Sequence, residues 1–307
     1  MNEKTIYALG FFDGVHLGHA ALLTACRRLA AARGWKAGVV TFSDHPDTLV
    51  LGRTPPLICT VQDRERLLRE DFRMDTVVTL PFDGAMKAMP WQDFLRLLAR
   101  EYGAAGFVCG ADFRFGCRGE GTAALLREVC RAREIPCAVV PQLKVDGQVV
   151  SSTCIRGLIA AGEMETAVRF LGHPYVLTGR VVHGCRIGRT LGIPTANLRL
   201  PPELATPRFG VYICRTVIDG TAYPAVTNIG TRPTVSDGDA VSVETFLLDF
   251  DGDLYDKTIR VEFCRRLRPE MKFPDTAALQ REIRKNAGET RAFFAEKESL
   301  NETGSAK

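Results

Sequence analysis

The sequence lacks any long hydrophobic run. No stretch approaches the roughly 20 consecutive apolar residues that a membrane-spanning helix needs. The opening segment, MNEKTIYALG, reaches a strand-like run without the basic and apolar regions of a secretory signal. We therefore expect a cytoplasmic protein with no membrane partner.

Closely spaced cysteines and an excess of one charge sign are also missing. The ten cysteines include no CxxC pair, and most lie inside apolar runs such as GFVCG and PCAVV. We therefore expect reduced core thiols rather than zinc ligands or disulfides. The net charge is only +4, from 40 Lys and Arg against 36 Asp and Glu. Such a small, dispersed charge predicts no nucleic-acid partner, although small anionic ligands remain compatible with it.

Two hydrophobic patterns follow each other along the 307 residues. Up to about residue 162, short β-branched runs alternate with amphipathic helical runs. This alternation predicts a parallel sheet with helices on both faces and ligands at the carboxyl ends of its strands. After Pro174, period-two segments joined by Asp-Gly turns predict a small antiparallel β-barrel with a C-terminal helix. We place the domains at residues 1–162 and 175–307, with a connector at 163–174.

The segment GFFDGVHLGH, residues 10–19, lies between the first predicted strand and the first predicted helix. Gly14 and Gly18 permit close approach of the backbone to a phosphate, and a helix N-terminus offers free N–H groups. His16 and His19, three positions apart, can donate to the same phosphate group. Downstream, the segment SSTCIR, residues 151–156, supplies hydroxyls at a predicted helix start and an arginine one turn later. These residues favour a nucleoside triphosphate site.

A second glycine-rich and basic segment, GCRIGRTLGIPTAN, covers residues 184–197. Pro194 fixes the backbone beside Thr195 and Asn197, whose hard oxygen atoms at alternate positions can ligate Mg²⁺ together with ATP phosphates. Taken alone, the segment could also be a structural loop. It is followed by NIGTRPT at 228–234 and VETFLLDF at 243–250. Glu244 is our candidate general base; the alternative is a solvent-facing strand residue.

The motifs together resemble a known family. HxGH with SSTxxR resembles the HIGH-type nucleotidyltransferases, and TFSDHP with CGADFRFGCRGEG narrows the likeness to FMN adenylyltransferases. PTAN, the strand carrying Glu244 and the closing segment RRLRPEMKF resemble the riboflavin kinase module. The chain thus resembles a bifunctional riboflavin kinase and FMN adenylyltransferase (prokaryotic-type FAD synthetase) over roughly residues 5–297. The fold implied is a Rossmann-like nucleotidyltransferase domain followed by the kinase barrel.

The resemblance implies that the second domain phosphorylates riboflavin to FMN and that the first adenylates FMN to FAD with release of pyrophosphate, both with Mg²⁺-ATP. For the first site it implies catalytic His16 and His19 and an ATP site of Gly10, Phe12, Asp13, Gly14, His16, Gly18, His19, Ser152, Thr153 and Arg156. The first site's flavin residues would be His45, Asp112, Phe113 and Phe115. For the kinase it implies catalytic Glu244, ATP contacts from Gly184, Arg189, Gly192, Pro194, Thr195 and Asn197, and flavin contacts from Asn228, Arg232, Glu244, Arg268 and Phe273. The Mg²⁺ ligands would be Thr195 and Asn197.

Some positions depart from the family pattern. Ser43-Asp44 stands where many relatives have Glu-Pro, and Asp112 where they often have Asn. Asp256 replaces a common Gly, and Asp would tolerate a positive φ there better than most residues. His45 could also be a residue that only stabilises its own turn. The alternatives are a flavin-binding regulatory protein with one or both activities lost and a nucleotidyltransferase for another phosphate. We expect a monomer or weak self-association.

Overall fold

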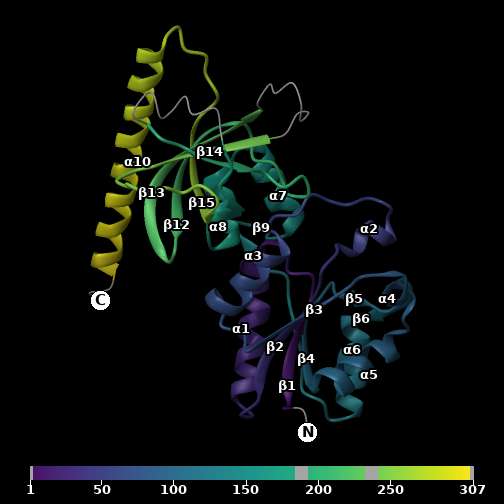
Figure 1. The fold of residues 1–307 in the computed structure, drawn as a ribbon. Coiled ribbons are helices and arrows are strands. Elements are labelled where there is room, and N and C mark those ends of the chain that lie inside the picture. Colours follow the sequence, from purple (N-terminus) through teal and green to yellow (C-terminus); the bar gives the residue numbers. More distant parts are fainter. Residues whose placement is uncertain (1–2, 184–192, 232–240, 305–307) are drawn as a thin grey trace. The chain divides into compact units, whose positions relative to one another are not determined.

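The structure is a computed structural model that describes residues 3–183, 193–231 and 241–304. Contacts divide the chain into two compact units (Figure 1). One comprises residues 1–155 and 170–172, and the other comprises residues 156–169 and 173–307. The domain limits predicted from the sequence, at 162 and 175, remain a prediction. No helix among the described residues combines the length and apolar character needed to cross a bilayer.

A five-stranded parallel sheet forms the centre of the first unit, in the order β3-β2-β1-β4-β7. Its strands are β1 (Thr5–Leu9), β2 (Lys36–Phe42), β3 (Thr76–Leu80), β4 (Ala104–Gly110) and β7 (Cys137–Val140). Every residue of β1 is buried. Because the chain leaves β1 toward β2 on one side and returns to β4 on the other, the sheet has its switch point beside β1, where ligands bind in such folds.

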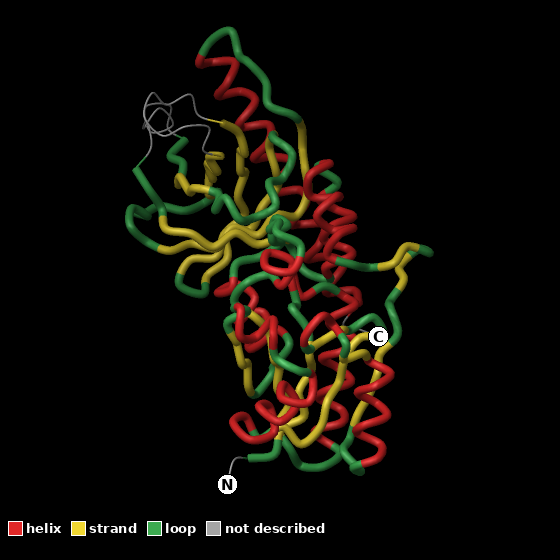
Figure 2. The backbone as a smooth tube through the Cα atoms, turned by 90° about the vertical axis from the view of Figure 1, so that its right-hand side faces the viewer, coloured by secondary structure: helices red, strands yellow, loops and turns green. Residues whose placement is uncertain are grey.

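Helices cover both faces of this sheet, as the sequence predicts (Figure 2). Ile6 and Ala8 of β1 pack in one core with Leu23 of α1, and Tyr7 and Leu9 pack in another with residues of α5 and α6. The helices are α1 (Leu17–Ala31), α2 (Pro46–Val50), α3 (Val61–Arg66), the π-helical turn η2 (Leu67–Asp71), α4 (Gly84–Ala88), α5 (Trp91–Tyr102) and α6 (Ala123–Ala132). Shorter elements are η1 (Asp13–Val15), β5 (Arg114–Phe115), η3 (Cys117–Gly119), β6 (Gly121–Thr122), β8 (Lys144–Val145) and β9 (Gln148–Val149).

The second unit contains a six-stranded antiparallel sheet that forms a nearly closed barrel, in the order β10-β15-β12-β13-β14-β11. Its strands are β10 (Tyr175–Arg180), β11 (Ala196–Arg199), β12 (Gly210–Ile218), β13 (Thr221–Thr231), β14 (Val241–Leu247) and β15 (Thr258–Arg268). The remaining helices are α7 (Ser152–Ala161), α8 (Met164–Leu171) and α10 (Thr276–Gly304), and α10 packs against β13. The predicted barrel with a C-terminal helix is confirmed.

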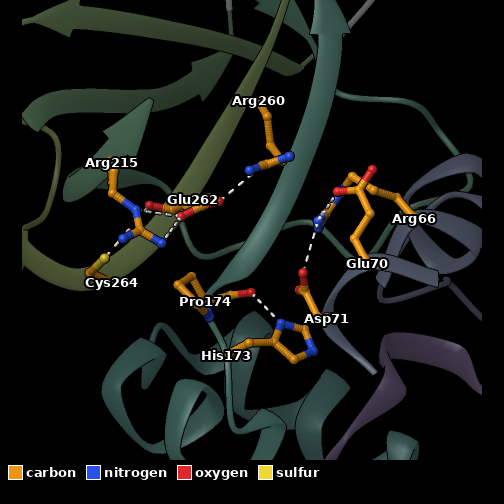
Figure 3. A network of polar contacts seen from close by, with 9 residues as sticks. All are labelled: Arg66, Glu70, Asp71, His173, Pro174, Arg215, Arg260, Glu262 and Cys264. Carbon is orange, nitrogen blue, oxygen red and sulfur yellow. Dashed lines mark hydrogen bonds and ion pairs between the residues drawn. The ribbon is translucent and has the colours of Figure 1, made fainter. Parts of the chain in front are cut away.

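A buried carboxylate on β15 is neutralised from two sides. Glu262 accepts hydrogen bonds from Arg215 Nε at 2.7 Å and from Arg260 Nε at 3.0 Å (Figure 3). Glu262 is only 5% exposed, so removing one partner would leave a buried charge poorly compensated. We regard this cluster as part of the barrel's framework, because both guanidinium groups are used to hold the strands β12 and β15.

Candidate functional sites

The turn after β1 has an unusual backbone. Phe12, Gly14 and Val15 all have positive φ, at 60°, 72° and 40°. Only glycine adopts such values without cost, and a β-branched residue such as Val15 is strained there. The turn brings the chain into α1 with His16 as the N-cap residue. The sequence marks this turn as a phosphate site, and the structure places it at the carboxyl end of β1.

Asp13 holds the turn against a neighbouring loop. Its Oδ1 accepts hydrogen bonds from the Ile58 N–H at 2.8 Å and the Cys59 N–H at 3.4 Å. Its carbonyl accepts a hydrogen bond from Ser152 Oγ at 3.1 Å. Ser152 begins α7, so this bond joins the two sequence motifs, residues 10–19 and 151–156. A direct contact of Asp13 with ATP remains a prediction.

The two histidines of the first motif lie against each other. Their ring centroids are 3.7 Å apart and the rings are nearly parallel. His16 Nδ1 accepts the backbone N–H of His19 at 3.3 Å, so a neutral His16 carries its proton on Nε2. Burial, His16 and the cation of Arg64 hold the pKa of His19 well below its usual range. His19 is therefore held neutral, and the two stacked rings are not both cations.

A cavity of about 250 Å³ opens beside these histidines. It lies at the carboxyl ends of β1, β4 and β7 and at the start of α7. Seven of the predicted site residues line it: Gly10, His16, Gly18, His19, Asp112, Phe113 and Ser152. The sequence did not single out Gln142, which also lines the cavity and donates from Nε2 to Asp112 Oδ2 at 3.2 Å. Gln142 follows β7 in a segment without a recognisable motif.

The other predicted residues of this site lie outside the cavity wall. The Phe12 side chain is fully buried in the core, which leaves its backbone for any contact with ATP. Phe115 is buried and stacks on Phe113 at 5.6 Å between ring centroids. His45 caps α2 by accepting the Asp47 N–H at 3.1 Å, which matches the local role we considered for it. Its contact with a flavin remains a prediction, as do the roles of Thr153 and Arg156 in α7.

Gly14 offers a direct test of the turn. A Cβ at this position would lie 2.7 Å from Ile58 Cγ2, and φ is +72°. We expect Gly14→Ala to lower the free energy of unfolding by about 2–3 kcal/mol, from the left-handed backbone plus overpacking. Gly34 is a matched control, because its φ is +65° and nothing lies within 4 Å of an added Cβ. Gly34→Ala should cost only about 1 kcal/mol. Urea unfolding measures both, and equal costs would show that Ile58 gives way freely.

The candidate kinase site is a row of three side chains across the barrel. Glu244 on β14 lies directly opposite Asn197 on β11 and Asn228 on β13. Residues directly opposite in antiparallel strands share a face, so the three predicted residues come together. Asn197 is 7% exposed, and its Nδ2 donates to the Thr195 carbonyl at 3.2 Å. Glu244 is half-buried in this row, which favours the site over the solvent-facing alternative.

Two further features surround this row. Asn228 Nδ2 donates to Glu270 Oε1 at 3.4 Å, a contact that the sequence did not indicate. Arg268 lies over the Phe273 ring at 5.7 Å, and its Nε lies 3.2 Å from Glu282 Oε1 of α10. Arg268 thus joins β15 to the C-terminal helix, and its flavin contact remains a prediction. Pro194 is exposed. The predicted residues Gly184, Arg189, Gly192 and Arg232 lie outside the described residues.

Asp256 has a φ of +65°, as expected if this position requires the left-handed region. Aspartate adopts that region more readily than most non-glycine residues. Its side chain pairs with Arg180 at 3.1 Å.

Each half of the chain matches a known protein family. A family model described as FAD synthetase matches residues 1–154, and one described as riboflavin kinase matches residues 171–294. Proteins named bifunctional riboflavin kinase/FMN adenylyltransferase are similar over nearly the entire sequence. The relative from Pseudomonas fluorescens is 35% identical over 94% of this chain and 93% of its own length. The relative from Escherichia coli K12 is 33% identical over 95% and 93%.

The fold is also similar to a solved structure. A crystal structure described as a macrolide-efflux protein from Streptococcus pneumoniae matches with a TM-score of 0.84 and 29% sequence identity, over 95% of each chain. The motifs at both sites, the two family matches and the relatives at more than 30% identity agree with one another. This chain belongs to the bifunctional riboflavin kinase/FMN adenylyltransferase family.

Proposed function

We propose that the chain makes both flavin cofactors. It phosphorylates riboflavin to FMN at the row of Asn197, Glu244 and Asn228, here called the barrel row. It adenylates FMN to FAD at the turn that carries His16 and His19, here called the histidine turn. The observation that carries this proposal is that each of the two units holds its own candidate site: the cavity beside the histidines in the first, and the row of Asn197, Glu244 and Asn228 in the second. ATP is the co-substrate of both reactions. Family membership supports the reactions, and the geometry of the described residues supports their assignment to sites.

In the adenylylation, an oxygen of the FMN phosphate attacks the α-phosphorus of ATP. A new P–O bond forms, the bond to the β-phosphate oxygen breaks, and pyrophosphate leaves. His16, whose Nδ1 is used within the turn, and the first residues of α1 line the cavity and would bind the triphosphate, and Ser152 lines the same wall. Such preorganised donors supply most of the catalysis in phosphorus transfer, where little covalent work falls to the protein.

In the kinase reaction, the terminal ribityl hydroxyl attacks the γ-phosphorus of ATP. Glu244 takes the proton of that hydroxyl as the new P–O bond forms and ADP leaves. Glu244 suits this task because its strand, β14, is paired with a strand on each side, which limits the movement of the carboxylate. Asn228, on the neighbouring strand, is placed to bind the flavin side of the site.

Thr195 and Asn197 fit a Mg²⁺ ion that accompanies ATP. Both supply neutral oxygen atoms, and Mg²⁺ commonly takes one or two protein ligands together with phosphate oxygens and water. No cluster of three or more His, Cys, Asp or Glu suited to a metal occurs within the described ranges. A site completed by the nucleotide therefore agrees with the donors present. The ion would neutralise phosphate charge during transfer.

A flavin assay tests the proposed function. The purified chain incubated with riboflavin, ATP and Mg²⁺ is expected to accumulate FMN and then FAD, separated by chromatography. Supplying FMN in place of riboflavin should give FAD directly. Excess EDTA should stop both conversions, and added Mg²⁺ should restore them. FMN without FAD would contradict the adenylyltransferase assignment, and FAD from FMN without any conversion of riboflavin would contradict the kinase assignment.

A further inference from the structure

Arg64, on α3, is a fully buried arginine that the motifs do not include. It is 1% exposed and forms no ion pair with a carboxylate in the described part of the chain. Its guanidinium instead donates from NH1 to the Phe11 carbonyl at 3.0 Å and from NH2 to the Phe42 carbonyl. Burying a cation is costly, and hydrogen bonds to neutral carbonyls offset only part of that cost. A framework role alone would be filled more cheaply by an apolar side chain.

The carbonyls that Arg64 binds lie at the site. Phe11 immediately precedes the turn that carries His16, and Phe42 ends β2. Thr41 Oγ1 donates to the same Phe11 carbonyl at 2.8 Å. The guanidinium also stacks over the Phe11 ring at 4.4 Å, and that ring contacts the His45 ring edge-on at 4.6 Å between centroids. One side chain therefore fixes the entry to the histidine turn and the aromatic ring against which His45 rests.

Arg64 also contributes charge to the site. The charged and titratable groups that act on His19 are His16 of its own turn and Arg64 of α3. Around Arg64 itself stand the carboxylates of Asp13 and Glu65, which partly offset its cation. A fixed cation at this position opposes the protonation of His19, and it cannot itself titrate in the physiological range.

We propose that Arg64 is a positioning residue for FMN adenylylation, which fixes the Phe11 carbonyl and ring so that the turn presents His16 and His19 to the triphosphate. This inference rests on the proposed adenylyltransferase function. Arg64 does not line the cavity, so it acts through the turn rather than on the substrate. Small displacements of positioned groups reduce rates strongly, by about 100-fold for a shift of about 1 Å.

Three variants test the role of Arg64. Arg64→Met removes both hydrogen bonds and the charge, and Arg64→Lys retains the charge. Arg66→Met is the matched control, because Arg66 lies two residues later and pairs with Glu70 at 3.5 Å and Asp71 at 3.4 Å (Figure 3). FAD formation from supplied FMN is measured for each variant, and FMN formation from riboflavin reports on the fold of the rest of the chain.

We expect Arg64→Met to lower kcat/KM for FAD formation about 100-fold while FMN formation stays within about twofold of wild type. Arg64→Lys should recover part of the loss, and Arg66→Met should behave as wild type. Histidine NMR spectra report on the charge at Arg64, which a purely structural role would not require. The spectra are simple to assign, because the chain has only five histidines. The His19 resonance, assigned with His19→Asn, should titrate at higher pH in Arg64→Met than in wild type or Arg64→Lys.

FAD formation within threefold of wild type in Arg64→Met would overturn the proposal. Equal loss of both activities with an unchanged His19 titration would also overturn it, since that result describes a framework residue. A wild-type chain that forms no FAD would instead contradict the proposed function itself.

Discussion

Glu244→Gln is expected to slow FMN formation from riboflavin about 10²- to 10⁴-fold, because the amide keeps the size of the side chain but cannot accept the hydroxyl proton. The neighbours of Glu244 in the row are the amides of Asn197 and Asn228, which are poor bases. Within the described residues, both cross-strand partners of Glu244 are amides, so neither of them can take over the role of base. Steady-state flavin chromatography at saturating ATP measures the loss.

The chain provides its own control for this variant. FAD formation from supplied FMN should remain at the wild-type rate, because the histidine turn belongs to the other unit. Glu203→Gln, an exposed position in the barrel half, should leave both activities unchanged. If Glu244→Gln forms FMN at more than about a tenth of the wild-type rate, Glu244 is not the general base.

His16→Ser is expected to reduce FAD formation from FMN about 10²- to 10³-fold, the usual loss when one preorganised donor to a reacting oxyanion is removed. Serine is chosen because His16 has two functions that can be separated. Its Nδ1 caps α1 by accepting the His19 N–H, and serine is a good N-cap residue. Its Nε2–H is the donor that we assign to the triphosphate, and serine is too short to replace it.

Comparison with His16→Ala separates the two functions. Alanine removes the cap as well, so it should lower the free energy of unfolding by about 1 kcal/mol relative to serine, with a similar loss of FAD formation. Riboflavin phosphorylation should be unaffected in both variants. If His16→Ser adenylates FMN at a rate near wild type while His16→Ala does not, the cap rather than phosphate binding explains the histidine.

Much of the architecture could be read from periodicity. Alternating strand and helix runs predicted the parallel sheet, because a strand buried on both faces reads as a continuous apolar run such as TIYAL. The same principle placed the residues of the first motif at the carboxyl end of β1. The motif after β1 and the start of α7 meet through Ser152 and Asp13, although 139 positions separate them.

Side chains whose role depends on packing could not be assigned in this way. Phe12 lies within the motif, yet its ring belongs to the core, whereas Arg64 lies in an ordinary charged helix and is buried beneath the turn. Gln142 and Glu270 have no local pattern that distinguishes them from exposed polar residues. In each case the decisive contact is with a segment distant in sequence.

The sequence by itself determined the residue types that meet phosphate and flavin chemistry, and the order of an α/β half and a β half, because these follow from local composition and periodicity. Only the tertiary structure decided the cross-strand register that joins Asn197, Glu244 and Asn228, the ring nitrogen of His16 left to donate, and the burial of Arg64. Register, tautomer and burial are set by which surfaces pack together, and a one-residue shift of a strand would move every side chain to the other face.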